Sequence, residues 1–145
     1  YDKYFDVVLS MMKEKDYSIS SKKGYLFMST DNLKKLHESG HSIGLHSHNH
    51  PTTLQRLSYK NQLEEYTKNY EFINSISNEK ITSMSHPLGN YNNDTLKILK
   101  KLEIKVGFRD SLFPSNIKSA LEIPREDHIN IMKVLRKNEN HSLYQ

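Results

Sequence analysis

The chain has 145 residues, a length that fits one domain with one hydrophobic core. It contains no cysteine, which excludes disulfides and thiol catalysis, so any metal ion must be held by histidines and carboxylates. The net charge of +4 comes from scattered lysines without a nucleic-acid-binding motif, and no apolar run approaches the ~20 residues of a membrane span, so neither nucleic acid nor a bilayer is an expected partner.

The first part of the chain predicts two helices and two short strands. An amphipathic helix is indicated by the spacing of Phe5, Val8, Leu9 and Met12. Residues 25–28 form an apolar run that predicts a strand. Ser29 or Thr30 is expected to cap a second helix, which Gly40 ends. Residues 43–46 predict the next strand.

The remainder of the chain continues the alternation of helices and strands. Ser58 is expected to cap a helix whose apolar face consists of Leu63, Tyr66, Tyr70 and Ile73. Asn92 or Asn93 should cap the next helix. Further elements are predicted as strands at 81–84, 104–108 and 121–123, and as a helix at 129–136. Such alternation implies a parallel or barrel-like α/β sheet, in which active groups lie at the carboxyl ends of the strands.

Four of the eight histidines fall within the segment HSIGLHSHNHP, residues 41–51. His46 and His50 lie four residues apart, and neutral imidazole is a good ligand for zinc and similar ions. A catalytic zinc site needs about three protein ligands, so a carboxylate would have to complete the set. Spacing alone supports a metal site and a solvent-facing polar strand end equally well. Of the histidines outside this pair, His37 is interpreted as a boundary residue and His41 as a structural residue. His141 has no assigned role.

The sequence around the histidine pair resembles a known family. The stretch ESGHSIGLHSHNHPTTLQRLS is similar to the second motif of the polysaccharide deacetylases, carbohydrate esterase family four. That motif reads His-Ser/Thr-x-x-His after Gly-His-x-Ile-Gly. The resemblance implies that His46 and His50 are metal ligands and that His48 lines the pocket without being a ligand. It also implies a distorted (β/α) barrel of the polysaccharide deacetylase type.

Two further segments carry the resemblance. The stretch SHPLGNYNND is similar to the family's third motif, a Pro-aromatic-Gly wall of the substrate groove, and its core here is Pro87, Leu88 and Gly89. The resemblance implies that the Leu88 backbone N–H helps to hold the oxyanion of the reaction. Tyr91 is a candidate for stacking on a sugar ring. The stretch LEIPREDHIN resembles a Pro-Arg segment near the end of many members and puts Arg125 in the arginine position.

The chain departs from the family at its first motif. That motif is an Asp-Asp pair that supplies the general base and the third metal ligand, and no two adjacent aspartates occur in this sequence. The segment that begins at Tyr1 resembles what normally follows the pair. We therefore expect the numbering to start after the first strand of the barrel, with the Asp-Asp pair upstream. Asp2 is expected to open a helix, where acidic residues are common, rather than to replace the pair.

Two other catalytic roles lack their usual residues. Ser85 stands where many members carry an arginine that orients the base. Arg125 is a candidate to replace it, because guanidinium grips a carboxylate bidentately, and a structural salt bridge is an equally supported role for it. The late Leu-x-Ile-His that supplies a general acid is not seen. His86 and His128 are candidate substitutes, since imidazole suits general acid work at neutral pH.

The resemblance implies a single, amino-terminally incomplete catalytic domain over residues 1–145. Its implied reaction is hydrolysis of N-acetyl groups on a sugar or polysaccharide, with release of acetate. The implied cofactor is a divalent metal, zinc first, with cobalt or nickel as alternatives. Two other functions stay open: a catalytically inactive relative that binds a glycan, and an amidase of the same fold that acts on a small non-glycan amide.

Overall fold

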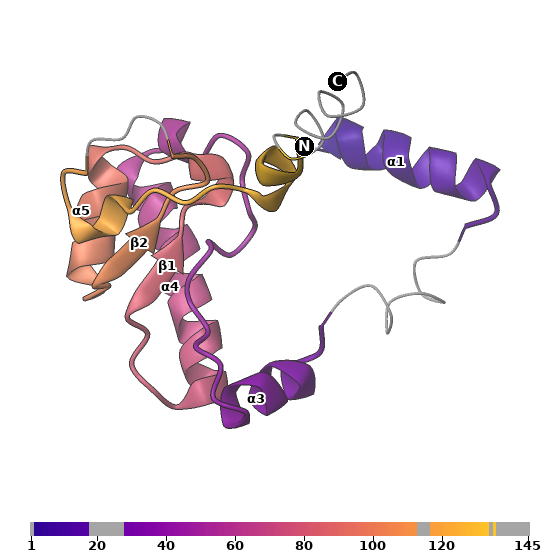
Figure 1. Cartoon of the computed structure of the whole chain (residues 1–145). Coiled ribbons are helices and arrows are strands. Elements are labelled where there is room, and N and C mark those ends of the chain that lie inside the picture. Colours follow the sequence, from indigo (N-terminus) through magenta and orange to yellow (C-terminus); the bar gives the residue numbers. More distant parts are fainter. Residues whose placement is uncertain (1, 18–27, 113–116, 134, 136–145) are drawn as a thin grey trace, which may run out of the picture. The chain divides into compact units, whose positions relative to one another are not determined.

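The computed structural model describes residues 2–17, 28–112, 117–133 and 135 (Figure 1). Two compact units divide the chain, the first spanning Tyr1–His41 and the second Ser42–Gln145. The strand predicted at 25–28 lies outside the described residues except for Met28, which is not in a strand.

The first unit contains helices α1, Asp2–Glu14, and α3, Thr30–Glu38. Helix α1 begins at Asp2, as expected. The predicted cap of α3 is Ser29, whose hydroxyl accepts a hydrogen bond from the Asn32 N–H, while the Asn32 side chain accepts one from the Ser29 N–H. This reciprocal pair satisfies two backbone donors that the first turn leaves without an acceptor.

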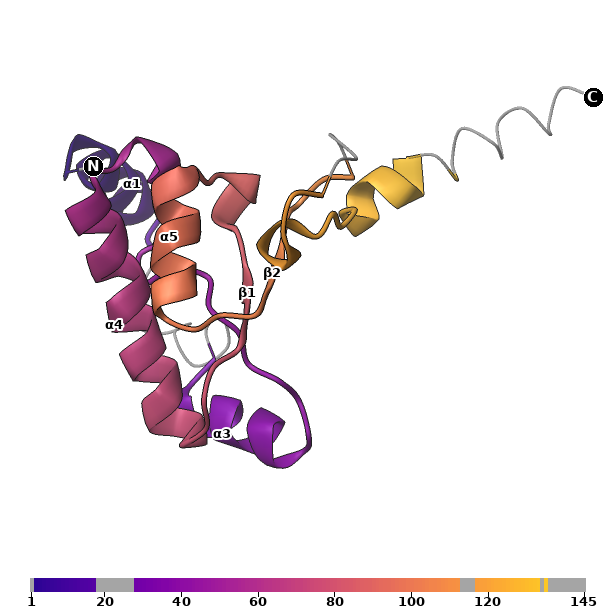
Figure 2. The same cartoon turned by 90° about the vertical axis from the view of Figure 1, so that its left-hand side faces the viewer.

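The second unit contains the two longer helices, α4 at Tyr59–Ser77 and α5 at Asn93–Lys101. Ser58 caps α4 and Asn92 caps α5, because each side chain accepts a hydrogen bond from a backbone N–H of the first turn. The two helices lie side by side against one face of the sheet (Figure 2). A buried hydrogen bond joins them, from the Thr95 hydroxyl to the side-chain oxygen of Gln62 at 2.6 Å.

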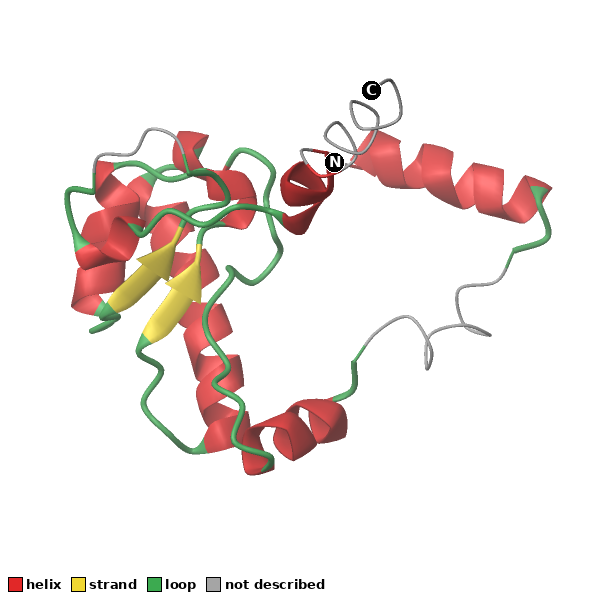
Figure 3. Ribbon diagram, in the orientation of Figure 1, coloured by secondary structure: helices red, strands yellow, loops and turns green. Residues whose placement is uncertain are grey.

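The sheet is built from two short parallel strands, β1 at Ser83–Ser85 and β2 at Val106–Phe108 (Figure 3). Single parallel bridges extend it on both sides, from Leu45 to Met84 and from Ile123 to Phe108. The order across the sheet is therefore Leu45, β1, β2 and Ile123. All four segments run in the same direction, so their carboxyl ends meet at one edge.

The strands predicted at 43–46 and 121–123 are shorter than expected. Each contributes one bridge rather than a strand. In the second case the 3-10 turn η3, Ala120–Glu122, takes up the preceding residues, and it is closed by a hydrogen bond from the Ser119 hydroxyl to the Glu122 carboxylate at 2.8 Å. The predicted strands at 81–84 and 104–108 are present but begin two residues later than expected.

The core of the second unit lies between the sheet and the two helices. It consists of Leu45, Leu54, Tyr66, Ile73, Ile81, Met84, Ile98, Leu99, Ile104 and Leu121.

The remaining helical elements are η1 at Leu54–Arg56, η2 at Pro87–Gly89, and a helix over residues 128–133 that begins one residue before the predicted start. Within the described ranges, every helix is too short or too polar to span a bilayer.

Candidate active site at the carboxyl ends of the strands

The histidine segment leaves the sheet directly after Leu45. The Leu45 N–H donates to the Ser83 carbonyl at 3.0 Å, and the Ser85 N–H donates back to the Leu45 carbonyl at 2.9 Å. The next residue is His46, so its side chain stands at the carboxyl end of the sheet beside β1. This is the position in which parallel α/β proteins carry their functional groups.

His46 and His50 lie side by side. Their ring centroids are 4.9 Å apart and the ring planes are inclined by 55°. The His46 Nδ1 atom is 2.8 Å from the Ser85 carbonyl oxygen. Because a carbonyl can only accept, Nδ1 carries the proton in the neutral ring and the Nε2 lone pair is left for another partner. A metal-binding histidine is typically fixed in the same way.

This pair fits two positions of a divalent metal site. Two imidazoles on one zinc ion, with nitrogens about 2.0 to 2.1 Å from the metal, have ring centroids roughly 5 Å apart. No group of three histidine, aspartate or glutamate residues that could hold a metal occurs among the described residues. A metal ion held by this pair would therefore need a third ligand in addition to the side chains that the described residues bring together.

The turn after β1 forms a second wall. His86 is 1% exposed, and its N–H donates to the Phe108 carbonyl at 2.9 Å. Pro87 is buried, whereas the Leu88 side chain is 52% exposed. Leu88 and Gly89 both have positive φ, 51° and 61°, which turns the backbone sharply here. The structure records no acceptor for the Leu88 N–H among the described residues.

A buried polar cluster lies behind this turn. The His86 and Tyr91 rings are stacked, with centroids 4.3 Å apart. Glu122 is 7% exposed and accepts a hydrogen bond from the Tyr91 hydroxyl at 3.0 Å. The Arg109 side chain is 5% exposed and interacts with Tyr91. Tyr91 therefore interacts with both a cation, Arg109, and a carboxylate, Glu122.

Burial sets the protonation of this cluster. Loss of hydration lowers the pKa of His86, and the Leu121 carbonyl and the charge of Glu122 oppose the shift only in part. The Nε2 atom is 2.8 Å from the Leu121 carbonyl oxygen, so Nε2 carries the proton of the neutral ring. The Nδ1 atom is buried without a hydrogen-bond partner among the described residues. Burial, followed by the Glu122 carboxylate, raises the pKa of Tyr91.

The other predicted site residues are placed differently. Arg125 is exposed, and so is His128, whose Nδ1 atom is 2.9 Å from the neighbouring Asp127 carboxylate. The His48 side chain is exposed. One face of the Tyr91 ring is covered by His86, which leaves only the other face for a sugar. The roles predicted for these four residues stay predictions.

Sequence reasoning missed Arg109 and Glu122, the two buried charged residues of the cluster. Arg109 follows β2 directly and so stands at the carboxyl end of a strand. That position was a usable signal. No such signal marked Glu122, because it lies inside a segment, 121–123, that was predicted only as a strand.

The fold and the site define a parallel α/β domain whose polar groups gather at the carboxyl ends of its strands. The chain belongs to the polysaccharide deacetylase family, whose model matches residues 6–107. The resemblance seen in the sequence is therefore confirmed. No curated protein sequence matches the chain.

Several solved structures share this fold. The Streptococcus pyogenes deacetylase PplD, solved in complex with acetate, superposes with a TM-score of 0.61 at 22% identity, over 85% of this chain and 58% of that one. IcaB from Ammonifex degensii gives a TM-score of 0.60 at 16% identity, over 82% and 60%. The Bacillus anthracis protein BA3943, a CE4 family pseudoenzyme, gives 0.51 at 18%, over 72% and 38%. The predicted polysaccharide-deacetylase-type α/β fold is confirmed, and the chain spans less than two thirds of each of these proteins.

Proposed function

We propose that the protein is a metal-dependent deacetylase that removes N-acetyl groups from a sugar or polysaccharide and releases acetate. The observation that carries the proposal is the histidine pair. His46 and His50 lie with ring centroids 4.9 Å apart at the carboxyl end of the sheet, and the Ser85 carbonyl fixes the tautomer of His46. Membership of the polysaccharide deacetylase family supplies the reaction class.

His46 and His50 would hold the metal, with zinc the first choice and cobalt or nickel as alternatives. A bound divalent ion would polarise the amide carbonyl and lower the pKa of water toward about 7. The Leu88 N–H would donate to the oxyanion, and its positive φ together with the lack of an acceptor among the described residues supports this role. Tyr91 remains the candidate for stacking on a sugar ring, through the ring face that His86 does not cover.

The departing amine needs a proton, and His86 and His128 remain the proposed donors. His86 lies close enough to His46 for the two rings to interact electrostatically, but its lowered pKa keeps it neutral near pH 7. His128 is exposed, and its Nδ1 atom lies 2.9 Å from the Asp127 carboxylate. Arg125 remains the proposed partner of a catalytic carboxylate.

A second function, a glycan-binding relative without activity, is favoured by a specific observation. Ser85 occupies the position where many family members carry an arginine that orients the base. BA3943, which has the same fold, is a pseudoenzyme. An amidase that acts on a small non-glycan amide would need the same histidine pair, so only a comparison of substrates separates it from the deacetylase.

The decisive experiment measures zinc binding and acetate release together. We expect H46A and H50A each to abolish zinc retention, measured by titration calorimetry, because either change leaves one protein ligand of the pair. H37A serves as the control and should bind zinc like the unaltered protein. Acetate release should be assayed, with the full gene product, on an N-acetylated sugar and on a small amide.

The outcomes separate the three functions. Zinc binding with acetate release from the sugar supports the deacetylase, and release only from the small amide supports the amidase. Glycan binding without release supports the inactive relative. Unchanged zinc affinity in H46A and H50A would show that the histidines are a polar strand end and would reject the metal site.

A further inference from the structure

The backbone of the histidine segment is held by helix α4. Glu65 accepts three hydrogen bonds from the segment: from the His48 N–H at 3.1 Å, the Asn49 N–H at 2.8 Å and the Asn49 side-chain amide at 2.6 Å. Asn69 accepts a fourth, from the His46 N–H at 2.9 Å. Both acceptors come from one helix, whereas the sheet contacts this segment only before and at His46.

Glu65 and Asn69 form a matched pair of acceptors. They are four residues apart on α4, so they project from the same face of the helix. Glu65 is flanked on the chain by Tyr66, which is fully buried, and Ile73 on the same helix is also buried. Packing therefore fixes the helix, and the helix in turn fixes the positions of the two acceptors.

The segment that they hold is strained. Ser47 and His50 are not glycines, yet their φ angles are +61° and +50°. A residue other than glycine is strained in this conformation and keeps it only where its surroundings over-determine it. The Ser47 hydroxyl accepts a hydrogen bond from the His50 N–H at 3.2 Å, which is a contact within the segment itself. Among the described residues, the hydrogen bonds that reach the backbone of residues 46–50 from outside the segment come from α4.

We propose that Glu65 and Asn69 are positioning residues that hold residues 46–50 in the strained conformation in which the two imidazoles face one ion. This inference rests on the proposed function for the metal and deepens it. Glu65 contributes most, because a carboxylate that accepts N–H bonds makes charge-assisted hydrogen bonds, which are stronger than neutral ones. Asn69 contributes a single neutral bond to the residue that carries the first imidazole.

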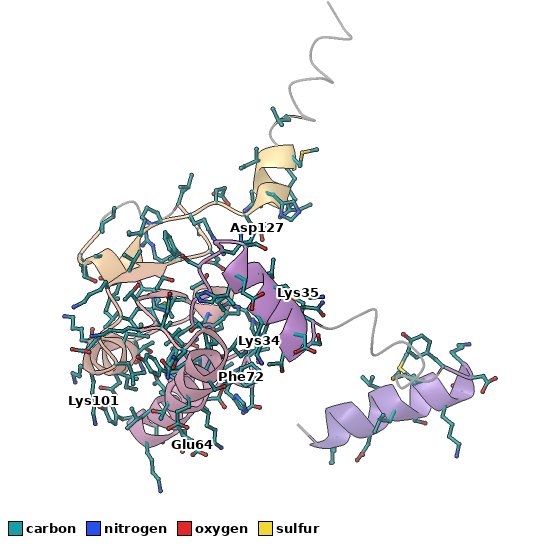
Figure 4. All side chains as sticks on the ribbon, turned by 90° about the horizontal axis from the view of Figure 1, so that it is seen from below. Lys34, Lys35, Glu64, Phe72, Lys101 and Asp127 are labelled. Carbon is teal, nitrogen blue, oxygen red and sulfur yellow. The ribbon has the colours of Figure 1, made fainter. Side chains whose placement is uncertain are left out.

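The test compares two neighbouring glutamates in the full chain. Glu64, labelled in Figure 4, is exposed and pairs with Lys68 at 2.6 Å, so E64Q is the matched control for E65A. We expect E65A to weaken zinc binding about 10- to 100-fold, the range typical for loss of a group that orients a metal ligand. E65Q keeps one acceptor oxygen and should fall between E65A and the unaltered protein. N69A should have a smaller effect, and E64Q none.

A second measurement does not depend on the metal. Amide hydrogen exchange should accelerate at His48 and Asn49 in E65A and at His46 in N69A, while the amides of β1 keep their protection. Faster exchange together with weaker zinc binding supports the proposal. Unchanged zinc affinity in E65A, with H46A still abolishing binding, would overturn the positioning role and leave the metal site standing. If H46A binds zinc normally, the proposed function fails, and the exchange data alone then decide whether α4 holds the segment.

Discussion

At the scale of single residues, His86 is the most constrained member of the site. Its ring is stacked on Tyr91, its Nε2–H donates to the Leu121 carbonyl, and only 1% of its surface is exposed. A charged imidazole would lose its hydration in this position, and the nearby Arg109 disfavours it further. The folded protein therefore holds His86 in its neutral form.

This predicts a pH dependence of stability. The unfolded chain binds a proton at His86 near pH 6.5, while the folded chain resists it, so the free energy of unfolding is highest above about pH 6.5 and falls as the pH drops toward the folded-state pKa. Urea denaturation between about pH 8 and pH 5 measures the slope. H86Q should show a shallower slope in the acidic range. Equal slopes in H86Q and the unaltered protein would contradict the assignment.

At the scale of elements, the close approach of Gly107 fixes the spacing at one side of the sheet. A Cβ atom at this position would lie 2.5 Å from the Leu121 carbonyl oxygen and 3.0 Å from the Leu121 Cα. Both are backbone atoms, so they can yield only if the segment that carries Ile123 moves. Gly40 presents the opposite case, because its φ is +87° but its Cβ would meet no atom within 4 Å.

We therefore expect G107A to destabilise the protein more than G40A. Overpacking against backbone costs about 1 to 3 kcal/mol, whereas forcing alanine into a left-handed conformation costs about 1 to 2 kcal/mol. Amide hydrogen exchange distinguishes the effects of the two substitutions. G107A should speed exchange of the Ile123 N–H, which donates to the Gly107 carbonyl at 2.9 Å. G40A should leave it unchanged, and an unaffected Ile123 amide in G107A would show that the contact is easily relieved.

The elements also show which features could be predicted from sequence. Ser29, Ser58 and Asn92 were predicted as caps because capping needs only the side chain and the next turn. The histidine pair was predicted from the resemblance to the polysaccharide deacetylase motif, whereas its spacing alone supports a polar strand end equally well. The lengths of the strands were not predicted correctly, because a strand ends where its neighbour no longer pairs with it. The buried positions of Arg109 and Glu122 depend on contacts from distant segments, which no local pattern encodes.

At the scale of the whole molecule, the proposed metal site has two candidate ligands among the described residues. The described residues bring two histidines together and no third ligand. The sequence has no Asp-Asp pair to supply the carboxylates that the resemblance assigns to the base and to the third ligand. A site of this kind should bind zinc weakly, because a catalytic zinc usually has about three protein ligands.

We expect the 145-residue chain by itself to release little acetate from an N-acetylated sugar. A positioned proton-transfer group contributes about 10² to 10⁴ in rate, and the loss of a metal ligand adds to this. The assay adds zinc or cobalt and uses the full gene product as the reference. Activity close to the reference would mean that a carboxylate within these residues serves as the base, and D2N and D127N would then identify it.

The attachment of the histidine segment to α4 has a use in recognising sites of this type in other sequences. Glu65 lies 16 residues after Asn49, and Asn69 lies 23 residues after His46. A His-Ser-x-x-His pattern is short enough to arise by chance, but chance does not also place two acceptors four apart on a following amphipathic helix. The pattern therefore becomes a longer signature with a physical meaning at each position. A transplanted loop would need the same helix face, so the smallest portable unit of this site is the loop together with α4.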